Sequence, residues 1–345
     1  MSDPLRVAII GLDHWYTAIP LAESFAAHPE VELVGIADLD PARAQEVAGK
    51  VGVERVTTTG EEFLTDPNVD VIAAYRSTEH NPSICVAAAE NGKHILSIKP
   101  MANTLEEATT ILNAVRTAGV RFVGSETRSR ASANHTQLHT WLKEGKFGQL
   151  INASFAMWTG SLPRGWPDAT DPGWFTAAGR APGGGWIDHS IYQIDQMRWM
   201  LGAEVAKVSG FAANYKHPKL PFEDYGHAIV EFENGVVATI EDTWTGPGVG
   251  RTYWSIVGTE GAASFDSITG KLSLAGAASE LDGWVQANPR NMWGDDTDEL
   301  VKAFRGEDTV LGGVEDSWRN FAACRAFYDA AESGTAVAPA ELPSA

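Results

Sequence analysis

The chain has 345 residues, of which 44% are hydrophobic and 21% are charged, the composition of a folded globular protein. Its formal net charge is −19, so little positive charge is left over to neutralise phosphates, and a nucleic-acid partner is not expected. The N-terminal apolar run is too short for a signal peptide, and no stretch reaches membrane-spanning length. We therefore expect a cytoplasmic protein without a membrane partner.

The first third of the sequence alternates short apolar runs with helical patterns. Strands are predicted at residues 6–10, 31–37, 69–74, 94–98 and 120–123, and helices at 19–27, 41–51 and 105–118. Strands that alternate with helices form a parallel, doubly wound sheet of the Rossmann type. The predicted fold class is thus α/β, with a dinucleotide-binding domain over residues 1–123.

The pattern changes after this point. Strands are predicted at 149–157, 205–215, 227–233, 236–245 and 253–259, and helices at 187–201 and 314–333. Asn234 and Gly235 join two alternating runs, which is a hairpin signal. We expect residues 124–345 to form an α+β domain for substrate binding and oligomerisation, with a large, mostly antiparallel open sheet and a loose tail at 336–345.

The loop after the first strand is a candidate dinucleotide site. The fingerprint G-x-G-x-x-G keeps only its first glycine here, because Asp13 and Tyr16 occupy the other two positions. A carboxylate about 5 Å from a phosphate costs roughly 3 kcal/mol at an effective dielectric of ~20. Asp13 can avoid this repulsion by capping the following helix. The cofactor contacts predicted here are Gly11, Leu12, Asp13, His14 and Trp15.

The second strand ends in Asp38, at the position where a carboxylate accepts hydrogen bonds from an adenosine ribose. A phosphate on that ribose would be repelled, so NAD is favoured over NADP. The alternative is that Asp38 only caps the helix that begins near Pro41.

Two further segments contain polar groups suited to catalysis. Lys99 follows a buried strand and precedes Pro100, at the edge where parallel sheets bind ligands. In the predicted helix 187–201, Asp188, Tyr192 and Asp195 share a stripe at i, i+4 and i+7. Asp188 and Tyr192 can therefore face one pocket; the alternative is a capping carboxylate and an interfacial tyrosine.

These segments resemble the Gfo/Idh/MocA oxidoreductases. The family markers are a βα glycine loop, G-K-H…E-K-P and G-G-x-x-x-D-x-G-x-H-x-x-D. This chain has Gly92-Lys-His94, Lys99-Pro100, the run from Gly183 to Asp195, Gly124-Ser-Glu-Thr-Arg128 and Gly258-Thr-Glu-Gly261. The sequence departs from the markers at Ile98, Ser190 and Tyr192, where the family has glutamate, glycine and its catalytic histidine.

The resemblance implies an NAD(P)-dependent dehydrogenase or reductase that acts on a secondary alcohol of a sugar, a sugar derivative or a cyclitol. It also implies a homodimer or homotetramer formed through the C-terminal sheet. It places further cofactor contacts at Ser77, Thr78, His80, Asn81, Lys99 and Arg128, and the local spacing fits Asn81 better than His80 for the position near the nicotinamide.

Lys99, Asp188 and Tyr192 are the predicted catalytic residues. Alcohol oxidation requires a hydride acceptor and a group that takes the hydroxyl proton. A neighbouring lysine cation is expected to lower the pKa of Tyr192, so either Tyr192 or Lys99 transfers the proton. Asp188 is expected to orient the lysine or the substrate hydroxyl.

Aromatic and basic side chains near the glycine run suggest a polyol-binding surface. Tryptophan faces suit sugar C–H groups, and arginines donate to hydroxyls or to an acidic substituent. The predicted substrate contacts are Trp158, Arg164, Trp166, Trp174, Arg180, Asp188, His189 and Tyr192.

Two other classes of function remain open at this point. One is an NAD-dependent glycoside hydrolase that acts by transient oxidation and elimination, and the other is a non-catalytic relative with impaired dinucleotide binding. Cys85 and Cys324 lie in apolar helical patterns and are predicted to be buried thiols. No residues have metal-ligand spacing, so no metal is expected.

Overall fold

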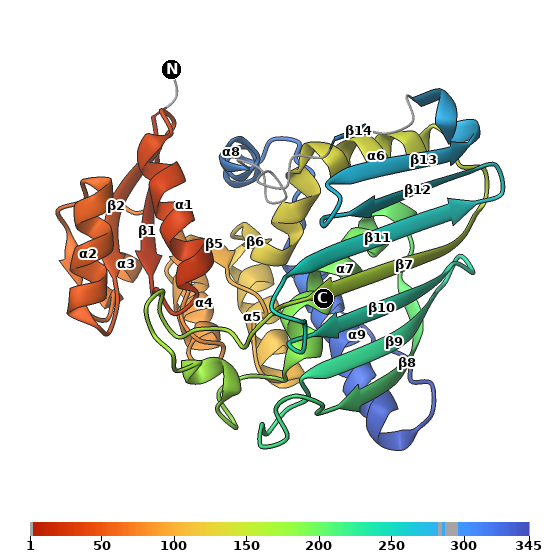
Figure 1. Ribbon diagram of the computed structural model, residues 1–345. Coiled ribbons are helices and arrows are strands. Elements are labelled where there is room, and N and C mark those ends of the chain that lie inside the picture. The colour runs from red at the N-terminus through yellow and green to blue at the C-terminus, as the bar shows by residue number, and fades with distance from the viewer. Residues whose placement is uncertain (1–2, 282–284, 287–295, 345) are drawn as a thin grey trace.

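The computed structural model describes residues 3–281, 285–286 and 296–344, which form two sheets side by side (Figure 1). The N-terminal sheet has six parallel strands in the order β3-β2-β1-β4-β5-β6. Its strands are β1 (Leu5–Ile10), β2 (Val31–Ala37), β3 (Val56–Thr57), β4 (Val71–Ala74), β5 (His94–Ser97) and β6 (Phe122–Gly124). This strand order is that of a Rossmann fold, so the predicted fold class is confirmed.

Helices cover both faces of this sheet. They are α1 (Trp15–Ala27), α2 (Pro41–Val51), α3 (Glu61–Thr65), α4 (Asn81–Glu90) and α5 (Leu105–Ala118). Strong end signals define α2 and α5: Asp40 accepts hydrogen bonds from the backbone of Ala42 and Arg43, and Thr104 with Glu107 forms a capping box. These two helices begin and end where the sequence predicts.

The second sheet has eight strands in the order β14-β13-β12-β11-β7-β10-β9-β8. They are β7 (Leu150–Trp158), β8 (Val205–Ala213), β9 (Tyr225–Phe232), β10 (Val237–Thr243), β11 (Arg251–Gly258), β12 (Gly261–Asp266), β13 (Lys271–Gly276) and β14 (Val285–Gln286). Only β7 and β10 pair in parallel, so the predicted, mostly antiparallel sheet is confirmed. The predicted hairpin joins β9 to β10, with Gly235 at φ 86°.

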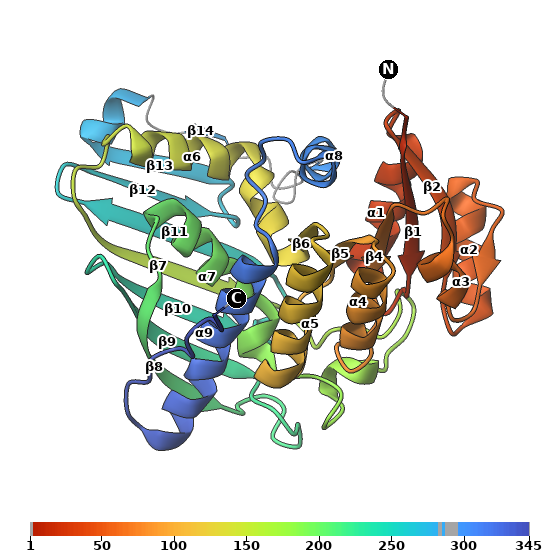
Figure 2. The ribbon, with the colours of Figure 1, turned by 180° about the vertical axis from the view of Figure 1, so that it is seen from behind.

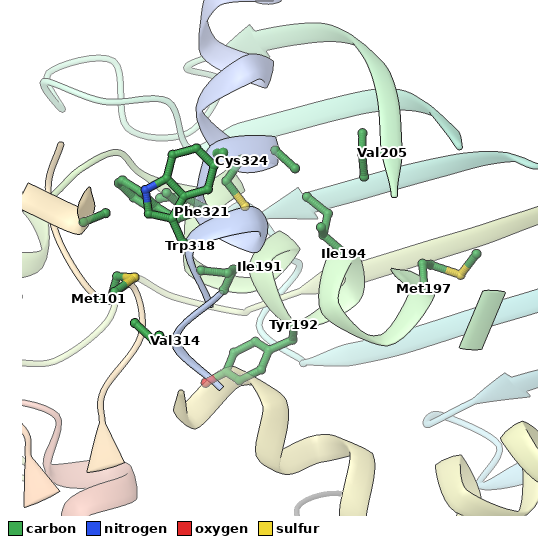
Figure 3. Packing of buried hydrophobic residues seen from close by; sticks show 14 of the residues in the cluster. Met101, Ile191, Tyr192, Ile194, Met197, Val205, Val314, Trp318, Phe321 and Cys324 are labelled. Carbon is green, nitrogen blue, oxygen red and sulfur yellow. The ribbon is translucent and has the colours of Figure 1, made fainter. Parts of the chain in front are cut away.

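Helices pack on one face of this sheet, and Figure 1 looks onto the opposite face, which carries none of the described helices. Figure 2 shows the helices α6 (Ala133–Lys143), α7 (Gly185–Leu201) and α9 (Val314–Ser333) on the covered face. Ile191 and Ile194 of α7 pack beside Trp318, Phe321 and Cys324 of α9 (Figure 3). Helix α9 also contacts α5, so it joins the two halves of the molecule.

The C-terminal tail is attached rather than loose. Val337 pairs with Val208 of β8, and the carbonyl of Pro343 accepts a hydrogen bond from Arg116. The expectation of a loose tail is therefore wrong for the described residues 336–344. Hydrogen bonding to an edge strand, which no local sequence pattern reveals, is the reason.

Residues 159–184, here called the connecting segment, lead from β7 to α7 and lie across the carboxyl ends of the parallel strands (Figure 1). Trp15 donates its indole N–H to the carbonyl of Arg164 over 2.8 Å, and Thr78 donates its hydroxyl to the carbonyl of Arg180 over 2.9 Å. The segment thus covers the loops that follow β1 and β4. None of the helices described is long and apolar enough to cross a membrane.

Candidate active site

Lys99 lies just beyond the carboxyl end of β5 and is 2% exposed. Its Nζ donates to Asp188 Oδ1 over 2.8 Å and also to the backbone carbonyl of Asp188. Asp188 belongs to the first turn of α7, so this ion pair connects the parallel sheet to a helix of the second half. The two residues that the sequence places in one site are in direct contact.

The second oxygen of Asp188 is also bound. Its Oδ2 accepts the indole N–H of Trp244 over 2.9 Å and lies 3.5 Å from Nδ1 of His189. Burial acts to raise the pKa of Asp188, but its interactions with His189 and Lys99 outweigh it and hold the pKa below its usual range. Burial likewise acts to lower the pKa of Lys99, but Asp188 outweighs it and the pKa is raised. Both groups are therefore ionised at neutral pH.

The glycine run explains how α7 reaches this position. A Cβ on Gly184 would lie 2.0 Å from the carbonyl oxygen of Glu223, so only glycine permits this approach. Glu223 Oε1 accepts the backbone N–H groups of Gly184 and Trp186 over 3.1 and 3.0 Å, and the hydroxyl of Tyr328 over 2.9 Å. A carboxyl group from a distant loop thus accepts hydrogen bonds from the backbone N–H groups at the N-terminus of α7, one turn before Asp188.

Tyr192 lies one turn after Asp188, with Lys99 Nζ 5.0 Å from its ring centre. Figure 3 shows its hydroxyl end directed away from Ile194 and Met197. Lys99 acts to lower the pKa of Tyr192, as the sequence predicts, but the net shift has the opposite direction. Burial raises the pKa of Tyr192 to about 12 and outweighs the effect of Lys99. Tyr192 is a neutral phenol at physiological pH.

Asp195, the third member of the predicted stripe, has a structural role. It is fully buried and receives two hydrogen bonds from Arg130, over 2.8 and 2.5 Å, and one from Asn320 over 2.8 Å. This pair ties α7 to α9 and to the 3-10 turn at Ser125–Ala131. Asp195 does not line the cavity described next.

A cavity of about 750 Å³ opens between α1 and the second half of the chain. Lys99, Asp188, His189 and Tyr192 line it together, so the predicted catalytic residues face one space. The other predicted site residues that line it are Trp15, Arg128 and Arg164. Tyr16, Phe175, Ser125 and Trp244 line it as well, although the sequence does not single them out.

The loop after β1 differs from the fingerprint in a specific way. Gly11 has φ +96°, and a Cβ there would lie 2.3 Å from Cδ of Arg76, whose side chain crosses the loop. Asp13 Oδ2 accepts the backbone N–H of Ser77 over 2.7 Å and lies 3.4 Å from Nε of Arg76. The prediction that Asp13 caps α1 is wrong, because it pairs with Arg76 and the N-cap position is held by His14.

Asp38 is 3% exposed and organises the same loop. Its two oxygens accept the backbone N–H groups of Leu12 over 2.7 Å and of Asp40 over 2.8 Å. The helix cap is Asp40, so the alternative that Asp38 caps α2 is wrong. Burial raises the pKa of Asp38.

His14 and Tyr16 join this loop to the connecting segment. His14 is fully buried, with Nδ1 3.0 Å from the hydroxyl of Tyr16. Its ring lies 4.7 Å from Trp174 and 5.4 Å from Phe175. Burial, and then the charge of Lys99, lower the pKa of His14 well below its usual value. Trp174 therefore packs against the β1 loop and lies outside the set that lines the large cavity.

The loop after β4 contains four of the predicted cofactor contacts. Ser77 and Thr78 are buried in hydrogen bonds to Asp13 and Arg180. Asn81 is fully buried and donates to Ser97 Oγ over 2.9 Å and to the carbonyl of Met101 over 3.2 Å, so it fixes the chain on both sides of Lys99. The side chain of His80 is half exposed at the start of α4 and lies 3.3 Å from Glu79.

The remaining predicted contacts are spread more widely. Arg128 is paired with Asp296 over 2.5 and 2.6 Å. Trp158 lies beneath Arg251 and Trp166 beneath Arg43, and neither lines the cavity. Arg180 pairs with Glu79 over 2.5 Å at the outer surface. These side chains are used in packing and ion pairs, which residue type alone does not distinguish from sugar binding.

Comparisons with known proteins agree with this arrangement. Residues 5–125 match the model of an oxidoreductase family with an NAD-binding Rossmann fold, and residues 135–264 match the GFO/IDH/MocA C-terminal domain. Scyllo-inositol 2-dehydrogenase (NAD(+)) of Bacillus subtilis is 28% identical over 270 residues, which cover 76% of this chain and 74% of that protein. The 1,5-anhydro-D-fructose reductase of Ensifer adhaerens is 27% identical over 310 residues, covering 88% and 90%.

A solved structure of levoglucosan dehydrogenase in complex with NADH and L-sorbose superposes with a TM-score of 0.85, covering 99% of this chain and 100% of the other. Its identity is 22%, so this similarity establishes the fold. Together, the two family models match residues 5–125 and 135–264, which make up most of the chain. The chain belongs to the Gfo/Idh/MocA family of oxidoreductases.

Proposed function

We propose that the protein is an NAD-dependent oxidoreductase that interconverts a secondary alcohol of a sugar or cyclitol and the corresponding ketone. The observation that carries this proposal is the ion pair of Lys99 and Asp188 in the 750 Å³ cavity, at the carboxyl end of a Rossmann sheet. The relatives are named as dehydrogenases and reductases of inositols and anhydrosugars, which supports the reaction class.

The residues around the β1 loop fit a dinucleotide. Within the described chain, α1 has no side-chain cap and no acidic residue in its first turn, so its N-terminal N–H groups are available to an anion. Arg76 offsets the charge of Asp13 there. Asp38 stands where a ribose hydroxyl would be recognised and disfavours a phosphate, so NAD is proposed rather than NADP. The bound nicotinamide would supply hydride transfer.

The side chains of the cavity would act on the reacting oxygen. The Lys99 ammonium and the neutral Tyr192 phenol are both donors at physiological pH, so they would orient the substrate oxygen and stabilise negative charge on it. Asp188 keeps Lys99 charged and in place.

The substrate is proposed to be a polyol ring. Phe175, Trp15 and Trp244 offer apolar faces in the cavity, and Arg164 and Ser125 offer polar groups beside them.

The protein is also proposed to be cytoplasmic. Cys85 and Cys324 are buried and form no disulfide, which is typical of a reducing compartment.

An assembly of two or four chains through the open sheet is also proposed. Phe211, Ile229 and Val237 are exposed on the face that Figure 1 presents, at 55%, 47% and 38%. Apolar side chains gathered on one sheet face are typical of a surface that is covered in an assembly. Sedimentation of the purified chain measures its oligomeric state.

The test of function combines binding and turnover. NADH fluorescence should report saturable binding, and NAD reduction should follow addition of scyllo-inositol or levoglucosan. Binding without turnover of either polyol, or of 1,5-anhydro-D-fructose with NADH, would remove the proposed substrate class. Cleavage of a glycoside without net NADH formation would instead favour the hydrolytic alternative, and failure to bind NADH would favour a non-catalytic protein.

A further inference from the structure

Oxidation of an alcohol needs a group that accepts the hydroxyl proton, and the two donors of the cavity are poorly suited to it. Lys99 is held as an ammonium by Asp188, and burial keeps Tyr192 a neutral phenol. The Asp296 carboxylate, which also lines the cavity, is bound by Arg128. A different side chain of the cavity is therefore better suited to accept the proton at neutral pH.

His189 has the position and the charge state for this role. It follows Asp188 in the first turn of α7 and lines the large cavity, with its side chain 14% exposed. Burial lowers the pKa of His189 and outweighs the opposing charge of Asp188, and the charge of Lys99 adds to the lowering, so the imidazole is neutral and one ring nitrogen can accept a proton.

The contact with Asp188 determines which nitrogen that is. Nδ1 of His189 is buried and lies 3.5 Å from Asp188 Oδ2, so a proton on Nδ1 would point toward the carboxylate. This arrangement leaves Nε2 unprotonated. A distance of 3.5 Å is long for a hydrogen bond, but such contacts commonly shorten when substrate binds.

Asp188 would also stabilise the product of proton transfer. Its Oδ1 is bound by Lys99, while Oδ2 faces His189 and Trp244. An imidazolium formed on His189 would therefore lie against a carboxylate that is already ionised and oriented. A carboxylate that holds the tautomer of a histidine and stabilises its cation is a recurrent catalytic arrangement.

We propose that His189 is the general base of the oxidation reaction, with Asp188 as the residue that positions it. This inference rests on the proposed function. The substrate O–H bond breaks and its proton goes to Nε2 of His189, while the C–H bond breaks and its hydride reduces the NAD nicotinamide. The carbon becomes a carbonyl, NAD is reduced, and the imidazolium then releases its proton to solvent.

His14, the other histidine near Lys99, does not fit this role. It is fully buried behind Tyr16 and packs against Trp174 and Phe175, and it does not line the large cavity. His189 lies three residues before Tyr192 in α7, and the two side chains line the same cavity.

The kinetic test uses the full chain, with scyllo-inositol and levoglucosan as probes. His189→Ala should lower kcat for NAD reduction by about 100-fold, the usual contribution of a general base, while NADH binding stays unchanged. Free imidazole added to His189→Ala should restore turnover in proportion to its unprotonated fraction. His139→Ala, a matched change on α6 that does not line the cavity, should keep wild-type kcat and show no response to imidazole.

Three kinetic results would overturn the inference: wild-type kcat in His189→Ala, loss of NADH binding in proportion to the loss of kcat, or no rescue by imidazole. If the wild-type protein fails to bind NADH or to oxidise either probe, the proposed function fails instead. These results distinguish the two failures.

A second measurement needs neither substrate nor cofactor. Nuclear magnetic resonance of the chain with ¹⁵N-labelled histidine reports which ring nitrogen is protonated, and His189→Ala assigns the signal. At neutral pH the Nδ1–H tautomer is expected, and Asp188→Asn should reduce its population. An Nε2–H tautomer, or an imidazolium, would contradict the assignment of His189 as the base.

Discussion

Nζ of Lys99 lies 2.8 Å from Oδ1 of Asp188, so the end of strand β5 and the first turn of helix α7 meet in one buried ion pair. Each residue comes from a different half of the chain. We therefore expect mutation of the pair to affect both stability and turnover, and the two effects can be measured separately.

Removing one member of the pair should destabilise the fold. Lys99→Met leaves the Asp188 carboxylate without its cation, a change that typically costs about 3–5 kcal/mol for a buried pair. The double variant Lys99→Met with Asp188→Asn should lose less stability than the sum of the single variants, because no unpaired charge remains. Urea unfolding of the four proteins measures this; additive losses would show that the pair is not coupled.

Asp195 offers a contrasting case on the same helix. Asp195→Asn weakens the buried pair with Arg130 and should lower the unfolding free energy by about 3 kcal/mol or more. Because Asp195 does not line the cavity, NADH affinity at a temperature where the variant is folded should equal that of the wild type. A large loss of affinity in a folded variant would place Asp195 in the site.

Trp244 should orient Asp188 through its indole N–H. Trp244→Phe removes this donor, and loss of one hydrogen bond to a charged group corresponds to about 1.5–3 kcal/mol. We expect a lower kcat with a smaller change in NADH affinity. Trp254→Phe, at a buried position of β11, is the control. Equal effects of the two changes would mean that only packing is involved.

Arg76 should supply part of the pyrophosphate binding that the missing glycines of the β1 loop would otherwise provide. Arg76→Gln removes the cation beside Asp13, and we expect NADH to bind about tenfold more weakly, which corresponds to about 1.4 kcal/mol. The affinity for adenosine, which has no phosphate, should stay the same. If both ligands bind as tightly as to the wild type, Arg76 has no part in recognising the pyrophosphate.

Glu223 should make stability depend on pH. Burial raises its pKa to about 7, from 4.5 for a free glutamate, so the folded state binds a proton that the unfolded state has lost between these values. The stabilising effect is therefore complete below about pH 4.5 and is lost as pH rises through about 7. Glu223→Gln keeps the acceptor for Gly184 and Trp186 but cannot ionise.

The comparison of Glu223→Gln with the wild type isolates this effect from other buried carboxyl groups. The wild type should lose stability relative to the variant as pH rises from 5 to 7, by about 3 kcal/mol at most. Urea unfolding at a series of pH values is the measurement. A constant difference across that range would show that the pKa of Glu223 is not raised.

The sequence predicts most of the fold because helix caps and turn residues mark the ends of several helices and strands. Caps at Asp40 and Thr104 locate α2 and α5, and the turn at Gly235 locates the β9–β10 hairpin. Helix α4, rich in alanine, has no polar face to mark it, and β12 and β13 alternate small residues too weakly to stand out. These elements depend on tertiary packing, which overrides propensity.

The sequence predicts the residues at the centre of the candidate site but not all of the residues that surround them. Lys99, Asp188 and Tyr192 follow recognisable motifs, and the structure brings them together. Trp244 and Arg76 reach the site through contacts between residues distant in sequence, which no local spacing reveals. Lys99 lowers the pKa of Tyr192 as predicted, but burial, which residue types in the sequence do not reveal, is the larger effect and raises it.

The rate of NAD reduction by the wild type and by Lys99→Met, with scyllo-inositol or levoglucosan as substrate, tests the role of the Lys99–Asp188 pair most directly. The variant should bind NADH and remain folded at low temperature, but its kcat should fall by at least about 100-fold, as expected when a group that acts on the reacting oxygen is lost. Turnover at the wild-type rate in a folded Lys99→Met protein would contradict the placement of the active site at this ion pair.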